Sequence, residues 1–333
     1  MTSRRPAGRG PAGPGDEHTT MDQDHDDTGA NRPGTGGGAG VAPDDGALPR
    51  ATRRPATSLL TWGIVALVLV IVIVLVAIKV AGTSVTTTSS SSPPPPAPPA
   101  VVQAVTKIPA SVYNAVGVTS PDTAITPPTV VSGAAPLQTH GRPEVLYVGE
   151  EFCPYCAAER WALVAALSRF GTFTGLEAST SGSNEAFPGT PTFSFAGTKY
   201  SSRYLAATLV EHYGDQKNPQ GTGYAVLTPL TRAERGLMRR YDRTPTGTML
   251  PFLDIANRGV LDGGVFSPSI LQQLNSTKIA AGLTDPKDPA TQAIVAAANE
   301  FSALICSADE EVPSSVCSSA GVTAASSALA LAP

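Results

Sequence analysis

The sequence is poor in charged and aromatic residues. Charged residues make up 15% of its 333 residues, against roughly 25% in an average globular protein, and aromatic residues make up only 6%. The formal net charge of −4 offers no excess of positive charge to a polyanion, so we exclude a general nucleic-acid-binding function. Four cysteines are too few for a disulfide-dense scaffold, but they are enough for one redox pair and one structural disulfide.

Residues 1–57 lack any Phe, Trp or Tyr, and their only large aliphatic residues are Val41 and Leu48. Eighteen of these 57 residues are Gly or Pro. A segment of this composition buries too little apolar surface to offset the entropy that it would lose on ordering. We therefore predict a disordered tail.

Residues 59–80 form a long apolar run with no charged residue before Lys79. As a helix with a rise of 1.5 Å per residue, this run is about 33 Å long, enough to cross a hydrocarbon core of about 30 Å. We therefore predict one transmembrane helix over residues 58–81.

Basic residues precede this span and are scarce after it. Three arginines lie between residues 50 and 54, whereas the next basic residue after Lys79 is Lys107. The positive-inside rule then predicts a cytoplasmic N-terminus and an extracytoplasmic remainder, in a single-pass protein of the cell membrane. A cleaved signal peptide is the alternative, but its apolar core has about 7–15 residues, so the longer run favours an uncleaved signal-anchor.

The chain after the span changes composition twice. Nine Ser and Thr residues are followed by a proline run at Pro93–Pro96, and polyproline is semi-rigid, so we predict a spacer over residues 82–104. Residues 105–320 hold most of the remaining large apolar residues and all four cysteines, which is enough chain for one sizeable core. We expect residues 321–333 to be flexible.

The first half of the folded part alternates between strand and helix patterns. Residues 144–149 have the pattern of a buried strand. A helix is predicted over residues 153–170, with Pro154 in its first turn and with Glu159 and Arg160 off its apolar stripe. A second strand is predicted over residues 173–179, and a hairpin over residues 191–200.

The second half begins with a capping-box pattern at Thr231–Glu234, which predicts a helix to about Asp242. Residues 252–261 predict a hairpin that turns at Asn257-Arg258-Gly259. Helices are then predicted from Ser267 through Leu274 and from Asp288 to Cys306. Strands alternating with helices indicate an α/β fold class.

The sequence Cys153-Pro154-Tyr155-Cys156 lies where the first strand gives way to a helix. A helix N-terminus carries partial positive charge and unpaired N–H groups, and both stabilise a thiolate. Cys153 would then attack the disulfide of a partner, and Cys156 would resolve the mixed disulfide. Glu150 and Glu151 would oppose thiolate formation if they lie close in space.

Two other interpretations of the cysteines remain open. A zinc site needs about four ligands, and the ten residues between Cys306 and Cys317 do not give zinc-knuckle spacing, so we predict no metal site. A purely structural bridge between Cys153 and Cys156 would close so short a loop that it adds little stability. We predict a structural disulfide between Cys306 and Cys317, the alternative being a second redox pair.

A strand followed by a C-x-x-C motif and a helix resembles the opening of the thioredoxin fold. That fold ends with a cis-proline, a β-hairpin and a helix, and Leu250-Pro251 with the segment after it resembles this ending. The resemblance implies a thioredoxin-like fold with an insertion of about a hundred residues, and it gives Pro251 the role of docking the backbone of the substrate. Pro191, in Thr190-Pro191-Thr192, is the rival candidate for this cis-proline.

Residues 149–163, with Ser168–Gly171, resemble the domain-of-unknown-function 929 family, a group of actinobacterial and archaeal membrane-anchored proteins with thioredoxin-like domains. The resemblance covers roughly residues 105–320 and implies no particular activity. Phe152 stands where thioredoxins have Trp. Pro154-Tyr155 is the glutaredoxin dipeptide and alters the redox potential, so the direction of electron flow stays open.

These observations predict a membrane-anchored thiol–disulfide oxidoreductase that acts on envelope or secreted proteins. It would need no bound cofactor, because the cysteine pair stores two electrons. It would need a redox partner to reset it, which we expect in the membrane. The alternative is a non-catalytic binding or adaptor protein that keeps the fold without the chemistry.

Overall fold

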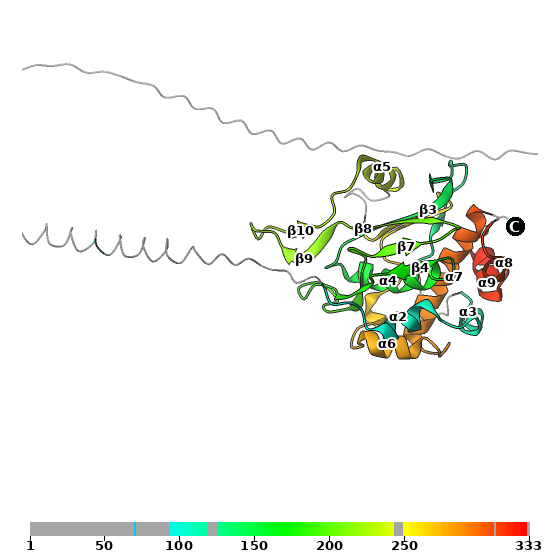
Figure 1. Cartoon of the computed structure of the whole chain (residues 1–333), viewed down its shortest axis with the longest axis horizontal. Coiled ribbons are helices and arrows are strands. Elements are labelled where there is room, and N and C mark those ends of the chain that lie inside the picture. The colour runs from blue at the N-terminus through cyan, green and yellow to red at the C-terminus, as the bar shows by residue number, and fades with distance from the viewer. Residues whose placement is uncertain (1–69, 71–93, 119–124, 243–248, 310, 332–333) are drawn as a thin grey trace, which may run out of the picture. The chain divides into compact units, whose positions relative to one another are not determined.

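The computed structural model describes residues 70, 94–118, 125–242, 249–309 and 311–331 (Figure 1). The chain divides into two compact units, Met1–Thr87 and Thr88–Pro333, and of the first unit only Val70 is described.

Three sequence predictions therefore lie wholly or largely outside the described residues. They are the disordered tail over residues 1–57, the transmembrane helix over residues 58–81 apart from Val70, and the first part of the spacer, residues 82–93. Within the part of the chain that the structure describes, no helix is long and apolar enough to cross a membrane.

A mixed β-sheet forms the centre of the second unit, and the fold is therefore of the α/β kind. The strand order is β1-β12-β11-β3-β2, with β8 also paired to β3. β3 runs parallel to β8 and antiparallel to β11, which forms an antiparallel hairpin with β12. The six strands are Thr129–Val130 (β1), Gln138–Thr139 (β2), Arg142–Gly149 (β3), Ala206–Glu211 (β8), Phe252–Ile255 (β11) and Gly259–Asp262 (β12). The predicted strand at 144–149 and the predicted hairpin at 252–261 are confirmed.

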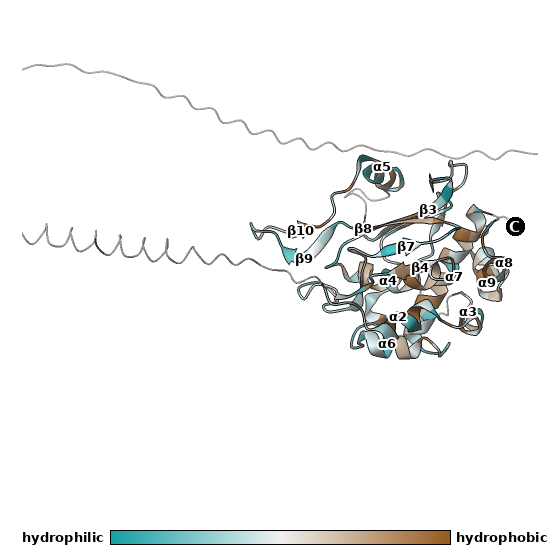
Figure 2. Ribbon diagram, in the orientation of Figure 1, coloured by the Kyte–Doolittle hydropathy of each residue, from teal (hydrophilic) through white to brown (hydrophobic). Residues whose placement is uncertain are grey.

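Helices α4 (Pro154–Leu167) and α7 (Pro289–Ala308) pack against each other on one side of this sheet (Figure 1). Small residues of the two helices, such as Ala162, Ala166 and Ala297, are fully buried. The apolar residues of these helices and of β3 form the main core (Figure 2). Both helices begin as predicted, α7 with the side chain of Asp288 as its N-cap.

The amphipathic pattern predicted for α4 is wrong in one respect. Glu159 and Arg160 were expected off the apolar stripe, but both are fully buried, because the sheet, α7 and the segments after α4 cover the helix on all sides. Every residue from Cys156 to Leu167 is buried.

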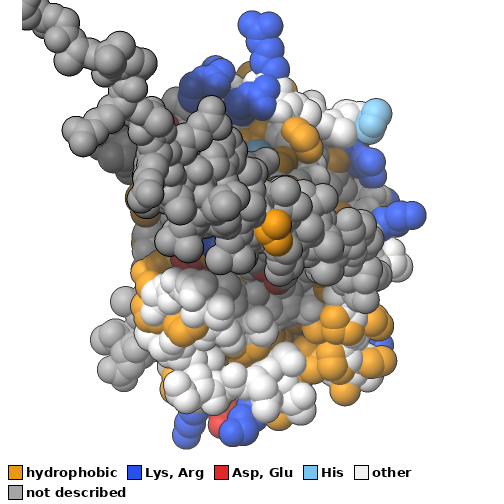
Figure 3. Space-filling view, turned by 90° about the vertical axis from the view of Figure 1, so that its left-hand side faces the viewer, with side chains coloured by type: hydrophobic (Ala, Val, Ile, Leu, Met, Phe, Trp, Pro, Cys, Tyr) orange, Lys and Arg blue, Asp and Glu red, His pale blue; other side chains and the backbone are white. Residues whose placement is uncertain are grey.

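Helix α5 (Arg232–Tyr241) lies on the opposite side of the sheet (Figure 1). Its predicted capping box is confirmed, because the Thr231 side chain accepts a hydrogen bond from the Glu234 N–H and the Glu234 carboxylate accepts one from the Thr231 N–H. Met238 covers a second, smaller apolar cluster on the sheet that includes Phe252. Lys and Arg side chains gather at this end of the molecule (Figure 3).

Two predictions for the segment between α4 and β8 are wrong. The single strand predicted over residues 173–179 is divided at Gly175, whose φ of +76° breaks the extended backbone. The hairpin predicted over residues 191–200 does not form, because its two strands pair with earlier strands, β6 with β5 and β7 with β4. The strands are Thr172–Thr174 (β4), Glu177–Thr180 (β5), Pro191–Ser194 (β6) and Lys199–Ser201 (β7).

A protruding hairpin follows β8, formed by β9 (Tyr213–Lys217) and β10 (Tyr224–Val226) (Figure 1).

After β12, the helix predicted from Ser267 to Leu274 is only a short 3₁₀ turn, η1 (Pro268–Ile270). The positive φ of Gln273 ends it, and α6 (Ser276–Gly282) starts anew with Asn275 as its N-cap.

The folded unit is longer at both ends than predicted. Helix α2 (Pro99–Thr106), placed in the predicted spacer, buries Val101 and Val105, and α3 (Ala110–Val116) follows it. Residues 321–328, within the segment predicted to be flexible, belong to α9 (Ala320–Ala328), which packs on α7 because Val322 and Ala325 lie on one face. Helix α8 (Ser314–Cys317) precedes α9, and the disulfide between Cys306 and Cys317 ties α8 to the end of α7.

Polar contacts join the N-terminal end of the unit to α7 and to the C-terminal end. The Asn299 side-chain amide donates to the carbonyls of Tyr113 and Gly117, at 2.9 and 2.7 Å. The Gly321 N–H donates to the Asn114 side chain at 3.1 Å. Arg169 donates to the side chains of Asn299, Ser302 and Ser319 and lies over the Tyr113 ring.

Glu300 of α7 is only 3% exposed, and burial raises its pKa to about 7 from 4.5. The folded state therefore holds this proton more tightly than the unfolded state, and the stability that the proton provides is lost as pH rises from about 4.5 through 7.

We predict that Glu300→Gln removes this loss. Between pH 5 and pH 8, the free energy of unfolding should fall by about 2–3 kcal/mol less in the variant than in the wild type, as measured by urea unfolding followed by circular dichroism. Glu311→Gln, at an exposed position, is the matched control. Parallel pH dependences for Glu300→Gln and the wild type would contradict the prediction.

Candidate active site

The two motif cysteines lie at the junction between β3 and α4. Cys153 is the N-cap of α4, and its Sγ accepts a hydrogen bond from the Cys156 N–H at 3.2 Å. Pro154 occupies the first helical position, where the missing N–H costs nothing. Both cysteines are free thiols, Cys153 being 8% exposed and Cys156 fully buried.

The two thiols have different pKa values because their surroundings differ. A hydrogen bond from the Cys156 side chain lowers the pKa of Cys153, and the Cys156 backbone N–H and the charge of Arg160 lower it further, against the opposing effects of burial and Glu150. Burial, together with the hydrogen bond to Cys153, raises the pKa of Cys156 well above its usual value. Cys153 is therefore the more acidic thiol of the pair, and Cys156 holds its proton.

The loop before β11 brings Pro251 to this pair. The Leu250–Pro251 peptide bond is cis, and the Leu250 carbonyl oxygen lies 4.0 Å from Cys153 Sγ. The pairing of Phe252 with Val148 of β3 sets this position and brings Leu250 to Cys153 across 97 residues of sequence.

Pro191, the rival candidate, is not preceded by a cis peptide bond. Its carbonyl accepts a hydrogen bond from Trp161 Nε1 at 2.9 Å, so it supports the packing of α4. The only cis peptide bond within the described residues is Leu250–Pro251.

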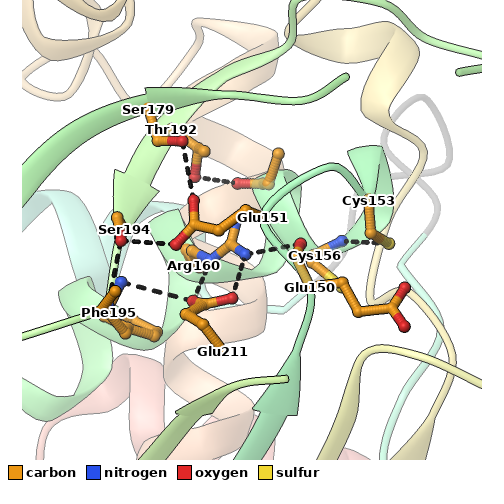
Figure 4. Close-up of polar contacts among 12 residues, drawn as sticks. Glu150, Glu151, Cys153, Cys156, Arg160, Ser179, Thr192, Ser194, Phe195 and Glu211 are labelled. Carbon is orange, nitrogen blue, oxygen red and sulfur yellow. Dashed lines mark hydrogen bonds and ion pairs between the residues drawn. The ribbon is translucent and has the colours of Figure 1, made fainter. Parts of the chain in front are cut away.

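A buried ion pair lies behind the cysteines (Figure 4). Arg160 of α4 donates to both carboxylate oxygens of Glu211, at the end of β8, at 2.8 and 2.6 Å. The same guanidinium donates to the Glu150 carbonyl at 2.8 Å. Arg160 thereby connects α4, β8 and the loop that carries Cys153. Although burial opposes it, Glu211 keeps the pKa of Arg160 well above its usual value, so the guanidinium remains a fixed positive charge.

Three further carboxylic acids surround this ion pair. Glu151 accepts hydrogen bonds from the hydroxyls of Ser194 and Ser179, at 2.5 and 2.9 Å. Burial and then the charge of Glu185 raise the pKa of Glu150 to about 7, and Figure 4 shows its carboxylate on the same side as Cys153. Burial and then the charge of Cys153 raise the pKa of the fully buried Glu159 well above its usual value.

Sequence reasoning missed Glu159, Arg160 and Glu211 as parts of the site. A signal for the first two was present, because a helix that is apolar all round is a buried helix, and its charged residues are then buried with it. Glu211 gave no such signal, since only the parallel pairing of β8 with β3 places it beside Arg160.

Aromatic residues flank the motif. Phe152 stacks on Tyr224 of β10, with ring centroids 3.7 Å apart. Tyr155, which is 38% exposed, packs edge to face with Phe187, and their ring centroids are 5.9 Å apart.

The other two cysteines, Cys306 and Cys317, are joined in the disulfide at the end of α7. Within the described residues, no group of three His, Cys, Asp or Glu side chains is arranged to hold a metal ion.

The negative charge of Glu150 raises the pKa of Cys153. We therefore predict that Glu150→Gln shifts the pH profile of Cys153 alkylation to lower pH, because the thiolate no longer forms beside a carboxylate. The alkylation rate of the reduced protein, measured between pH 5 and pH 9, tests this, with Glu311→Gln as the control. A profile that stays in place or moves to higher pH would refute it.

Replacing one partner of the Arg160–Glu211 pair leaves the other charge buried. We predict that Glu211→Leu lowers the free energy of unfolding by about 3–5 kcal/mol. The double variant Arg160→Met with Glu211→Leu should recover most of this loss, because no charge is then left unpaired. Denaturant unfolding of the three proteins tests both statements, and a single variant as stable as the wild type would disprove them.

Comparison with known proteins finds a match to one family. No curated protein and no solved structure matches the chain. The sequence model of the domain of unknown function DUF929 matches residues 129–307, more than half of the 333 residues. The matched segment includes both motif cysteines, Arg160, Glu211 and Pro251. The chain therefore belongs to the DUF929 family.

Proposed function

We propose that this protein is a thiol–disulfide oxidoreductase, anchored in the cell membrane, that acts on envelope or secreted proteins. The observation that carries the proposal is the asymmetry of the cysteine pair. Cys153 caps a helix with its sulfur held by a backbone N–H, whereas Cys156 is fully buried and keeps its proton.

The topology supports a thioredoxin-like fold with a large insertion. The motif lies between a central strand and a helix, and β3 is flanked by parallel β8 and antiparallel β11. A cis-proline precedes β11, and the β11–β12 hairpin leads to helices that return to the sheet. The strands β4 to β7 and the β9–β10 hairpin belong to the insertion between the two halves. In this proposal Pro251 docks the backbone of the substrate next to Cys153.

The reaction follows from the two sulfurs. The Cys153 thiolate attacks one sulfur of a substrate disulfide, the S–S bond breaks, and the other substrate sulfur leaves and takes up a proton. Cys156 then loses its proton and attacks Cys153 Sγ, which releases the second substrate thiol. The substrate disulfide gains two electrons and two protons. Both electrons come from the Cys153–Cys156 pair, one proton comes from Cys156, and the other comes from the solvent, which took up the Cys153 proton when the thiolate formed. The reverse sequence introduces a disulfide into a substrate dithiol.

Nearby charged groups serve this exchange. Arg160 stabilises negative charge on either sulfur. Glu150, with its pKa raised to about 7, takes up and returns a proton near neutral pH. No bound cofactor is needed, but a redox partner must reset the pair, and we place that partner in the membrane.

The extracytoplasmic location rests on the sequence around residues 59–80. A disulfide between Cys306 and Cys317 agrees with an oxidising compartment, because cytosolic thiols are kept reduced.

One observation favours a second candidate, a non-catalytic binding or adaptor protein of the envelope. Cys153 is only 8% exposed, which limits the approach of a partner disulfide. The two candidates differ in whether Cys153 bonds to other proteins in the cell.

We predict that Cys156→Ser traps Cys153 in mixed disulfides, because no thiol remains to resolve them. Full-length protein in its native membrane would be quenched with acid, alkylated and separated on non-reducing gels. Discrete adducts that disappear with reductant, and that are missing from the Cys153→Ser/Cys156→Ser control, are expected. A single monomer band, with Cys153 open to alkylation in the same membranes, would favour the adaptor.

A further inference from the structure

Helix α5 concentrates positive charge in a chain whose formal net charge is −4. Four of its ten residues are arginines, against one glutamate within the helix and Asp242 at its C-cap. All four arginines are exposed, and Figure 3 shows Lys and Arg side chains gathered at this end of the molecule. They are Arg232, Arg235, Arg239 and Arg240.

The packing of α5 directs most of this charge outward. Leu237, Met238 and Tyr241 lie on one side of the helix and pack on the smaller apolar cluster of the sheet. Arg232, Arg235 and Arg239 follow the opposite side at intervals of three and four residues. We call these three arginines the basic face. The apolar side of the helix is therefore covered by the fold, whereas the basic face points away from it.

Described neighbours do not neutralise the basic face. The only ion pair among the described residues is that of Arg160 with Glu211, behind the cysteines. Glu234, the acidic residue of α5, is used in the capping box. Arg235 donates to the carbonyl of Leu230, a neutral acceptor, and so keeps its charge. The basic face thus presents unmatched positive charge to the surroundings.

The proposed anchor keeps this face close to lipid. The folded unit is held from Pro95 onward, because the Pro95 carbonyl accepts a hydrogen bond from the Ala178 N–H at 2.9 Å. Residues 82–94 lie between the predicted span and this contact, and fully extended they reach about 45 Å at most. The membrane surface is therefore present at a high effective concentration for an exposed face of the unit.

The shape and chemistry of the basic face suit a phosphate-bearing surface. Guanidinium groups bind phosphate through two parallel N–H donors. The arginines lie along an exposed helix at the edge of the molecule (Figure 1), and a row of charges on a convex helix meets a surface rather than enclosing a small ligand. Val226 and Leu227, in the segment that leads into α5, are 51% and 48% exposed. A membrane surface accepts such apolar side chains beside basic ones.

We propose that the basic face of α5 binds the phosphate groups of anionic phospholipids and so holds the folded unit against the membrane surface. The inference rests on the membrane anchor of the proposed function and is independent of its thiol chemistry. Eight residues, 242–249, connect α5 to Leu250, whose carbonyl oxygen lies 4.0 Å from Cys153 Sγ. Binding of the helix would therefore hold the cysteine pair near the membrane, where we place its redox partner.

The test measures how fast phenylglyoxal modifies each arginine of the full-length protein, reconstituted in vesicles of phosphatidylcholine alone or mixed with phosphatidylglycerol. Each arginine near an anionic surface strengthens binding about fivefold, so three of them should keep the basic face on the lipid. We therefore expect the basic face to react at least about fivefold more slowly in the anionic vesicles. The slowing should disappear at high salt. Arg203, exposed between β7 and β8, is the internal reference and should react equally fast in both.

The double variant Arg232→Gln with Arg239→Gln should bring the rates at Arg235 in the two kinds of vesicle to within about twofold, because most of the charge of the basic face is lost. Lys278→Gln with Lys287→Gln is the matched control. It removes the same charge from exposed positions in and after α6, on the other side of the sheet (Figure 1), and should keep the wild-type slowing. Equal slowing at Arg203, or the same loss in both double variants, would overturn the assignment to α5.

An alkaline carbonate wash separates the two levels of the proposal. If the wash removes the protein from both kinds of vesicle, the membrane anchor of the proposed function fails. If the protein resists the wash but the basic face reacts equally fast in both, lipid binding is overturned while the anchor stands. Slowing by a soluble acidic peptide, but not by the anionic vesicles, would assign the face to a protein partner and would likewise overturn lipid binding.

Discussion

The buried contact between Arg160 and Glu211 is the interaction on which the site depends. Removing a guanidinium from water is costly unless its charge is matched and it is hydrogen-bonded. Here Nε and Nη2 donate to the carboxylate at the end of β8, and Nη2 also donates to the Glu150 carbonyl, whereas Nη1 has no hydrogen-bond partner among the described residues. Because these partners come from β8 and from the loop after β3, the arginine fixes the angle at which α4 leaves the sheet. That angle places Cys153 as the helix cap.

The same arginine also sets the electrostatic balance of the cysteine pair. Its positive charge lowers the pKa of both sulfurs, whereas Glu150 raises that of Cys153. Since the pair is buried, these charges act at short range and with little screening by water. The helix terminus therefore favours the thiolate, and the carboxylates moderate this preference. The pKa of Cys153 is therefore lowered, whereas the pKa of the fully buried Cys156 is raised well above its usual value.

Patterns of residues close in sequence correctly predicted the elements next to the cysteine pair. The strand before Cys153, the helix after it, the capping box at Thr231 and the turn at Asn257 each depend on residues that are close in sequence. Predictions failed where partners are distant. Strands β6 and β7 pair with β5 and β4 rather than with each other, and no local pattern encodes that choice. The burial of Glu159 and Arg160 depends on what covers α4 from outside, and α9 was missed because its short apolar face has meaning only against α7.

The contacts of α7 with both ends of the folded unit bear on how the protein is made. Asn299 supplies the hydrogen bonds that hold Tyr113 and Gly117, and Gly321 bonds to Asn114 across 207 residues of sequence. Helix α3 thus emerges from the ribosome long before its partners exist. Contacts of such high sequence separation form late, because the closure of a long loop must come first. The face of α3 that packs on α7 and α9 therefore stays uncovered until almost the entire chain has been synthesised.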